Sequence, residues 1–306
     1  MSEDRQIQIT VAENEAGQRL DAFLAAKIPD MSRSYIQKLI EDGLILVNGQ
    51  STKGKVKTYS GMNIEVYMPE AEPLQVKPEN IPLNIVYEDS DILIINKPRD
   101  MVVHPAPGNK DNTLVNALLY HCRDSLSDIN GIIRPGIVHR IDKDTTGLIA
   151  VAKNNKAHQS LAQQLKDRSM KRVYEAIVEG IIKEDRGTID APIGRHPIDR
   201  KRMAVTPGKG KEAVTHFEVL ERLKGATYIR VRLETGRTHQ IRVHMSYINH
   251  PVYGDPLYGR NTKKLTGGQM LHARFLRLRH PSTGEYMEFE AELPGDFIEL
   301  LESLRV

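Results

Sequence analysis

The chain has 306 residues, which at roughly 100–200 residues per domain indicates about two domains. Hydrophobic residues make up 40% and charged residues 27%, a composition that excludes a fibre or a long disordered chain. No stretch approaches the ~20 apolar residues of a membrane span, and the polar N-terminus has no apolar signal core. We therefore expect a cytoplasmic protein with no membrane partner. The one cysteine, Cys122, permits no internal disulfide and no thiolate metal cage.

Charge is unevenly distributed, although the formal net charge is only +3. Residues 134–280 contain 29 Lys and Arg against 14 Asp and Glu, whereas segments 1–133 and 281–306 each have a net charge of −6. A central block at +15 indicates a polyanionic partner. A solvated surface explains any single basic cluster equally well, but it explains the whole block less well because acids are sparse there.

The N-terminal part of the chain reads as a small α+β unit. Residues 1–16 are expected to form a loose or strand-forming arm. Apolar residues at helical spacing then predict a helix that Pro29 ends and a second helix that Ser32 caps. A strand over 44–47, a tight turn at Asn48-Gly49 and a last strand over 62–67 complete a unit spanning residues 17–70.

The rest of the chain is predicted to form one larger domain. Prolines and acids over 71–83 cannot sustain a helix or a central strand, so we interpret this segment as a linker. The domain over 84–306 alternates strands and helices without a regular βα period, which favours an α+β fold with a mixed sheet. Strands are expected over 91–96, 147–152, 174–182, 228–233 and 286–293, and helices over 112–121 and 157–165.

Basic side chains are concentrated in the second half of the small unit. They could form one positive edge that follows a phosphate backbone, although a solvated helix face explains them equally well. The stretch RLDAFLAAKIPDMSRSYIQKLIEDGLILVNGQ resembles the S4-type RNA-binding domain over about fifty residues. That resemblance implies RNA contacts from the second helix and the following hairpin, at Arg33, Lys38, Lys53, Lys55 and Lys57.

The segment GIVHRIDKDTTGL, residues 136–148, contains the first candidate catalytic group. Asp142 follows an apolar run and has Arg140 and Lys143 beside it. A carboxylate among cations stays ionised and is available as a nucleophile or a base, although a surface salt bridge is the simpler explanation. Asp144 and the two threonines after it are expected in a turn or a helix cap.

Two further segments contain candidate site residues. Tyr174, in KRVYEAIVEG, could pack in the core of a strand, stack on a base or donate a proton. In ETGRTHQIRVHM, residues 234–245, Thr238 is placed to cap a helix, and Arg242 is expected to pair with a buried carboxylate. Histidines are frequent nearby, but no HxxH or HExxH spacing occurs and no acid lies within the helix, which disfavours a metal site.

Four motifs together resemble the RluA family of pseudouridine synthases. They are NKPRDMVVHP at 96–105, HRIDKDTTGL at 139–148, KRVYEAIVEG at 171–180 and GRTHQIRVH at 236–244. They occur in the family's order and cover nearly all of residues 84–280. Their combination with an S4-type module resembles the RluC and RluD branch, which acts on large-subunit ribosomal RNA. Within that branch the residue sequence DKDTTGL is closer to RluD. One departure is Ile141, where the family usually has Leu; the two are close in volume.

The resemblance implies a pseudouridine synthase fold with a mixed, largely antiparallel sheet, and an enzyme that isomerises uridine to pseudouridine in RNA. It implies that Asp142 is the catalytic aspartate, that Tyr174 lies against the target base and that Arg242 pairs with the aspartate. It further implies that Arg140 moves into the RNA to support a flipped base, and that Leu271 forms an apolar pocket wall.

Because the reaction oxidises nothing and transfers nothing away, we expect no cofactor and no metal, and the chain has neither a P-loop nor a Gly-x-Gly-x-x-Gly fingerprint. Arg200, Lys201 and Arg202 are expected to form a loop that binds the RNA backbone, and we expect a monomer. Two alternatives stay open: a non-catalytic RNA-binding ribosome assembly factor, and a glycoside-type hydrolase of RNA bases. The second needs another carboxylate beside Asp142, and none is obvious.

Overall fold

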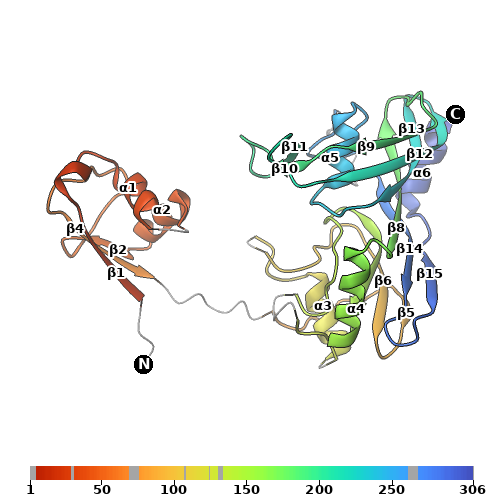
Figure 1. Cartoon of the computed structure of the whole chain (residues 1–306), viewed down its shortest axis with the longest axis horizontal. Helices are drawn as coiled ribbons and strands as arrows, with labels where there is room; N and C mark the ends of the chain where they lie inside the picture. The colour runs from red at the N-terminus through yellow and green to blue at the C-terminus, as the bar shows by residue number, and fades with distance from the viewer. Residues whose placement is uncertain are drawn as a thin grey trace. The chain divides into compact units, whose positions relative to one another are not determined.

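A computed structural model describes residues 5–28, 31–68, 76–106, 108–123, 125–129, 134–260 and 268–305. The chain divides into two compact units, residues 1–73 and 74–306, each with its own core (Figure 1). Within the described ranges, no helix is both long enough and apolar enough to cross a bilayer.

The first unit packs two helices against an antiparallel sheet with strand order β1-β4-β2-β3. Its elements are β1 Arg5–Thr10, the 3-10 turn η1 Glu13–Glu15, α1 Leu20–Lys27, α2 Arg33–Glu41, β2 Ile45–Val47, β3 Gln50–Ser51 and β4 Asn63–Met68. As predicted, Ser32 caps α2, because its hydroxyl accepts the Tyr35 N–H at 3.2 Å. Asn48 and Gly49 both have positive φ, which suits the tight turn between β2 and β3.

The limits of this unit differ from those inferred from composition. Residues 5–10, expected in a loose or strand-forming arm, form the edge strand β1 of the sheet and so belong to this unit. Residues 71–75 of the expected linker lie outside the described residues. Residues 76–83 belong to the second unit, where Val76 is buried in the same core cluster as Leu93 and Leu114, and Ile81 and Leu83 pack against it. Prolines prevent a helix here, but they do not prevent apolar side chains from packing.

The second unit is built on a nine-stranded sheet with the order β5-β6-β7-β14-β8-β13-β12-β9 and β15 paired to β14. Only β7 and β14 run parallel, so the predicted α+β class with a mixed, largely antiparallel sheet is confirmed. The strands are β5 Ile85–Glu88, β6 Ile92–Lys97, β7 Thr146–Ala152, β8 Lys171–Glu179, β9 Arg186–Asp190, β12 Val214–Leu223, β13 Ala226–Leu233, β14 Leu271–Arg279 and β15 Tyr286–Glu290. A separate hairpin pairs β10 Ile193–Arg195 with β11 Met203–Val205.

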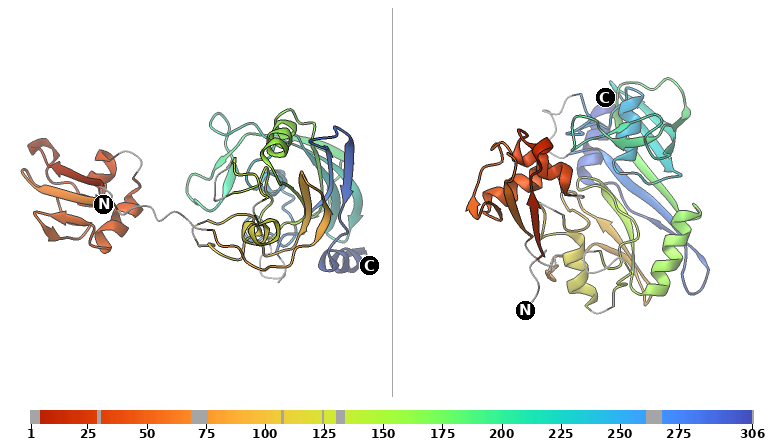
Figure 2. Two further views of the ribbon diagram at one scale, coloured as in Figure 1. Left: turned by 90° about the horizontal axis from the view of Figure 1, so that it is seen from below. Right: turned by 60° about the vertical axis from the view of Figure 1, so that its left-hand side comes forward.

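Helices cover both faces of this sheet (Figures 1 and 2). In β6, Ile92 and Ile94 pack with α4 Asn155–Lys166, and Leu93 and Ile95, which point the other way, pack with α3 Leu114–Cys122. The same alternation holds in β8, where Val178 packs with α5 Gln240–Tyr247 and Ile177 with α6 Gly295–Arg305. Strand β8 is thus buried on both sides, and Tyr174 faces the α5 side.

The central parallel pair depends on a glycine. Gly147 has φ +109°, and a Cβ there would lie 2.4 Å from the carbonyl oxygen of Ala273. Only glycine therefore allows β7 to approach β14 directly after the Asp142 segment.

The start of α5 corrects one prediction. Thr238 was expected to cap this helix, but the residue before Gln240 is His239, which has φ +56° and makes no side-chain cap. A side chain from inside the helix bonds the preceding turn instead: Oε1 of Gln240 accepts the Arg237 N–H at 2.9 Å. A glutamine inside the helix can fold back in this way, and nothing in the local pattern distinguishes it from a threonine cap.

Candidate active site

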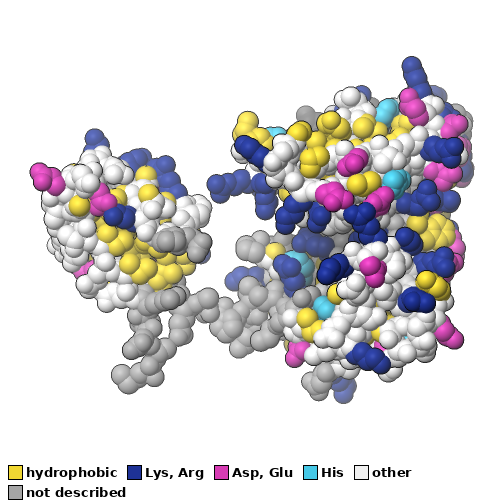
Figure 3. Space-filling model, in the orientation of Figure 1, with side chains coloured by type: hydrophobic (Ala, Val, Ile, Leu, Met, Phe, Trp, Pro, Cys, Tyr) yellow, Lys and Arg dark blue, Asp and Glu magenta, His cyan; other side chains and the backbone are white. Residues whose placement is uncertain are grey.

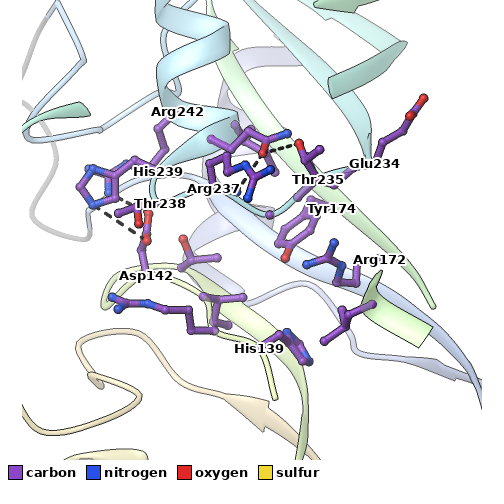
Figure 4. A pocket seen from close by; sticks show the side chains of 18 of the residues that line it. His139, Asp142, Arg172, Tyr174, Glu234, Thr235, Arg237, Thr238, His239 and Arg242 are labelled. Carbon is purple, nitrogen blue, oxygen red and sulfur yellow. Dashed lines mark hydrogen bonds and ion pairs between the residues drawn. The ribbon is translucent and has the colours of Figure 1, made fainter. Parts of the chain in front are cut away.

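A cavity of about 560 Å³ lies between the Asp142 segment, β8 and the start of α5 (Figure 4). Five residues singled out from the sequence line it: Arg140, Asp142, Tyr174, Arg242 and Leu271. They come from four segments separated by up to about 130 residues. Pairing among β7, β14 and β8 brings the Asp142 segment, Leu271 and Tyr174 together, and α5, which packs on β8, adds Arg242. The cavity also extends to Lys166 and Arg168 at the end of α4.

Arg242 joins two carboxylates at the floor of this cavity. Its Nη1 donates to Oδ2 of Asp142 at 2.9 Å. Its Nε and Nη2 donate to the two oxygens of Asp255 at 2.7 and 2.9 Å, a two-pronged pairing that fixes the plane of the guanidinium. Asp255 is fully buried, whereas the Asp142 side chain is 16% exposed. Asp142 is therefore the carboxylate that a molecule in the cavity can reach.

The surroundings keep this guanidinium charged. Burial acts to lower the pKa of Arg242, but hydrogen bonds to Asp255 and the charge of Asp142 outweigh it, so the pKa is raised. The Tyr258 ring lies 5.2 Å from the guanidinium carbon, which adds a cation–π contact. Arg242 is thus a fixed counter-ion for the Asp142 carboxylate.

His239 presents a polar hydrogen to the same carboxylate. The Tyr258 hydroxyl accepts the Met203 N–H at 2.8 Å, so its own proton is free to be donated to Nδ1 of His239, 2.9 Å away. Burial lowers the pKa of His239, and the neutral ring then has its proton on Nε2, 4.0 Å from Oδ1 of Asp142. Figure 4 shows His239 and Arg242 approaching Asp142 from the same side.

A buried lysine holds the loop that contains Asp142. Lys97, at the end of β6, is fully buried, and its Nζ donates to the carbonyl oxygens of Pro98, Met101 and Lys143 at 2.7–2.9 Å. Burial lowers the pKa of Lys97 to about 7, although the nearby Asp144 and Asp142 oppose the shift. The loop is thus fixed by a residue of the NKPRDMVVHP motif to which the sequence analysis assigned no role.

Arg99 and Gln269 fix the other side of this loop. Arg99 Nη1 donates to the carbonyl oxygens of Asp144 and Gln269 at 2.9 and 2.8 Å, and Gln269 Nε2 donates to Thr145 Oγ1 at 3.0 Å. Thr145 N–H also donates to the Asp142 carbonyl, so the predicted turn forms. No helix begins here, and Thr146 instead starts β7.

Tyr174 and Leu271 form an apolar wall of the cavity. Both are buried, at 5% and 4% exposure, and Figure 4 shows the Tyr174 ring across the cavity from Asp142. Burial raises the pKa of Tyr174, so the phenol keeps its proton. Arg172 lies beside it on the same strand, and its Nε has no hydrogen-bond partner among the described atoms.

Arg140 is held at the cavity by a neutral acceptor. Its Nη1 lies 3.0 Å from Nε2 of His104, whose Nδ1 lies 3.2 Å from the Pro105 carbonyl oxygen. A guanidinium can only donate, so Nε2 must be unprotonated and Nδ1 must donate to Pro105. Burial lowers the pKa of His104, and the Arg140 charge lowers it further, which agrees with a neutral ring. An exposed arginine held by an uncharged group is released more easily than one held by a carboxylate.

A second carboxylate in the cavity wall is already engaged. Glu234 pairs with His216 Nε2 at 2.7 Å and with Arg168, and the bond to His216 lowers its pKa. Both Glu234 oxygens thus already have partners, which disfavours Glu234 as the proton donor of a glycoside-type hydrolase. The geometry thus disfavours that alternative.

Other predicted RNA contacts lie outside the cavity. Arg200, Lys201 and Arg202 lie in the loop between β10 and β11, and Arg202 is 5.1 Å from the Tyr258 ring. Figure 3 shows Lys and Arg side chains gathered around the recess between the upper and lower halves of the second unit.

In the first unit, Lys38, Lys53, Lys55 and Lys57 are all exposed, but the last three lie on the connection after β3 rather than on the hairpin itself. Arg33 differs, because it pairs with the buried Asp21 at 3.1 Å. Asp21 also accepts from Arg19 and from Gln37.

Among the described residues, two clusters have ligand atoms close enough to hold a metal: Glu88, His121 and Cys122, and Asp89, Asp91 and His280. Neither lines the cavity. Burial raises the pKa of Cys122 to about 11, which keeps its thiol protonated, and the Asp89 oxygens already accept from backbone N–H groups, Tyr87 and His280. The absence of a metal stays a prediction.

Comparisons with known proteins agree on one family. The family model for RNA pseudouridylate synthases matches residues 91–247, and the family model for the S4 domain matches residues 18–56. The uncharacterized RNA pseudouridine synthase YlyB of Bacillus subtilis (strain 168) is 54% identical over 300 residues, 98% of each chain. The ribosomal large subunit pseudouridine synthase D of Escherichia coli (strain K12) is 47% identical over 319 residues, 100% of this chain and 96% of that one.

A solved structure gives the same result. Human RNA pseudouridylate synthase domain containing 1 superposes with a TM-score of 0.57 at 28% identity, over 78% of this chain and 98% of that one. The resemblance found in the four motifs is therefore confirmed, and it favours an enzyme over a non-catalytic assembly factor. The chain belongs to the RNA pseudouridylate synthase family and is an RNA-modifying isomerase that also contains an S4 domain.

Proposed function

We propose that this enzyme converts specific uridines of large-subunit ribosomal RNA into pseudouridine and that Asp142 is the group that acts on the nucleotide. The observation that carries the proposal is the Asp142 carboxylate, which opens into a cavity while Arg242 holds it from behind at 2.9 Å. Asp255 supplies the second negative charge, so Arg242 stays fixed when Asp142 reacts.

The reaction breaks the C1′–N1 bond, rotates the base and forms a C1′–C5 bond. The proton on C5 is lost and N1 gains one, so the product is an isomer of the substrate. Asp142 can attack as a nucleophile or abstract a proton from the sugar. Both routes need a carboxylate with a counter-ion in a closed site, and Arg242 supplies that counter-ion.

The target uridine must leave its stack before it reaches Asp142, which costs a few kcal/mol. Tyr174 and Leu271 offer an apolar surface for the extruded base. Arg140 is the residue that enters the RNA in its place, and its release from His104 exchanges one hydrogen bond to a neutral ring for contacts with a polyanion.

Large-subunit ribosomal RNA is the proposed substrate because relatives that cover almost the whole chain are named for that activity. The S4 domain, with Lys38, Lys53, Lys55 and Lys57, supplies a second contact with the RNA backbone. We propose a monomeric, cytoplasmic enzyme.

The experiment maps pseudouridine in ribosomal RNA from cells with and without the gene. Cells that lack the protein should lose pseudouridine at defined positions of the large-subunit RNA, and the wild-type gene should restore all of them. A gene with Asp142→Asn should restore none, although the variant protein is present in equal amount. Unchanged pseudouridine in the deletion strain would exclude this substrate.

A further inference from the structure

The hairpin of β10 and β11 presents an isolated apolar side chain to solvent. It projects from the second unit (Figures 1 and 2), and Ile198 lies at its tip with 88% of its surface exposed. Among the described large hydrophobic residues, the next most exposed, Tyr247 and Tyr286, reach 58%. Neither the core nor the cavity explains Ile198.

The tip that holds Ile198 is a built structure and not a loose end. Nδ1 of His196 accepts the N–H groups of Ile198 and Asp199 at 3.3 and 3.0 Å. Asp199 Oδ1 accepts the Lys201 N–H at 3.0 Å, and Arg195 donates to the Arg200 carbonyl at 2.9 Å. These bonds fix the backbone around Ile198 with its side chain outward, so an apolar contact made there loses little conformational entropy.

Positive charge surrounds this apolar tip. Arg195, Arg200, Lys201 and Arg202 flank it, and within the described ranges none of them has an acidic partner. Arg195 donates to the Arg200 carbonyl and Arg202 lies over the Tyr258 ring. The only acid of the loop, Asp199, points an oxygen at its own backbone. The tip therefore combines an exposed apolar side chain with cations that no acid neutralises and that can contact phosphates.

The base of the hairpin is joined to the catalytic helix. Ile193 of β10 shares a core cluster with Val243 of α5, the neighbour of Arg242. The N–H of Met203 donates to the Tyr258 hydroxyl, and the Tyr258 ring contacts the guanidinium groups of both Arg202 and Arg242 at 5.1 and 5.2 Å. The position of the tip is thus fixed relative to Asp142.

We infer that Ile198 is a wedge that inserts between stacked bases of the RNA substrate while the target uridine occupies the cavity. This inference rests on the proposed function and adds a positioning residue to it. Apolar wedges with flanking cations unstack a base step while the cations hold the phosphates on either side. A protein partner fits less well. A specific protein interface buries roughly 1,000 Å² or more, and the apolar surface of one isoleucine among cations is far smaller than that.

The first test compares tritium release from uridine-labelled, unmodified large-subunit ribosomal RNA transcript. Ile198→Ala removes three carbon groups, each worth about fourfold when fully withdrawn from water, and should lower kcat/KM at least about tenfold. Ile198→Leu should stay near wild type. The matched control is Ile181→Ala, which removes an isoleucine that is 43% exposed elsewhere on the same unit and should change nothing.

Salt dependence separates the wedge from its cations. Lys201→Ala should weaken binding and reduce the slope of log affinity against log salt by about 1, whereas Ile198→Ala should weaken binding with an unchanged slope. Equal kcat/KM for Ile198→Ala and wild type on naked RNA would overturn the inference, even if the variant is impaired on ribosomal particles. If the wild type releases no tritium, the proposed function fails, and the binding titrations still decide on the wedge.

A direct readout uses the absence of tryptophan from the chain. Ile198→Trp places a single tryptophan at the tip, which is excited selectively over the 11 tyrosines, and insertion between bases should quench its emission and protect it from acrylamide. Ile181→Trp is the control and should respond to RNA in neither way. Emission from Ile198→Trp that stays unchanged at saturating transcript would refute the wedge.

Discussion

Asp255 offers the sharpest test of how the site is held together, since the sequence analysis did not select it. It is fully buried and accepts four hydrogen bonds, from Nε and Nη2 of Arg242 and from the N–H groups of Leu257 and Tyr258. Asp255→Asn keeps the volume of the side chain but removes the charge that faces Arg242. The buried guanidinium then has one counter-ion, Asp142, in place of two.

The expected loss is large for a single isosteric change. Breaking a buried ion pair by removing one partner costs about 3–5 kcal/mol of unfolding free energy. In a unit of this size each kcal/mol lowers the melting temperature by about 2–4 °C, so the catalytic unit should melt roughly 6–20 °C lower. An arginine released from Asp255 also no longer orients Asp142, and a misplacement of about 1 Å can lower kcat about 100-fold.

Thermal unfolding and tritium release from labelled RNA measure these two effects. Asp185→Asn is the matched control, because Asp185 pairs with Arg222 at 2.6 Å but is 86% exposed, and an exposed pair contributes about 1 kcal/mol or less. Asp255→Asn should lower the melting temperature and kcat, and Asp185→Asn should lower neither appreciably. An Asp255→Asn enzyme with wild-type stability and wild-type kcat would refute this account of Arg242.

Three further predictions follow from other contacts. Lys97→Met leaves the Lys143 carbonyl without its donor, so kcat should fall at least tenfold in the tritium assay while RNA affinity stays unchanged. Burial lowers the pKa of His272 to about 4, below its value of about 6.5 in the unfolded chain. Between these two pH values the unfolded state binds a proton that the folded state does not, so the free energy of unfolding falls as the pH falls from about 6.5 to about 4. His272→Asn, which keeps an acceptor for the Thr146 hydroxyl, should reduce the slope of unfolding free energy against pH by up to about 1.4 kcal/mol per unit in denaturant titrations at pH 4.5–6.5. Lys55→Gln should weaken RNA binding and reduce its salt slope by about 1 while leaving the melting temperature unchanged.

Local pattern predicted most elements of this fold because their signals are local. The helix capped by Ser32, the Asn48-Gly49 turn and the alternating strand at 228–233 each depend on residues close in sequence. The family resemblance and the α+β class, both confirmed, depend on motif order and on alternation. The roles assigned to Asp142, Tyr174 and Arg242 stay predictions, although the structure places all three around one cavity.

The groups that support the site were missed because their partners are distant in sequence. Asp255 lies in a turn between Gly254 and Pro256, where an acid is ordinary; only the fold shows that it meets Arg242. Lys97 bonds the Lys143 carbonyl across 46 residues, and a lysine after an apolar strand normally reaches solvent. The pair Lys97-Pro98 could have indicated the buried lysine. It ends a strand that is buried on both faces, so the lysine side chain cannot reach solvent.

The central claim is that the Asp142 carboxylate performs the chemistry, and one measurement tests it most directly. Purified Asp142→Asn and wild-type enzyme are incubated with uridine-tritiated large-subunit ribosomal RNA after equal RNA binding has been established. We predict tritium release by the wild type and none above background by Asp142→Asn. Release by the variant at a rate near that of the wild type, with its affinity for RNA intact, would contradict the account.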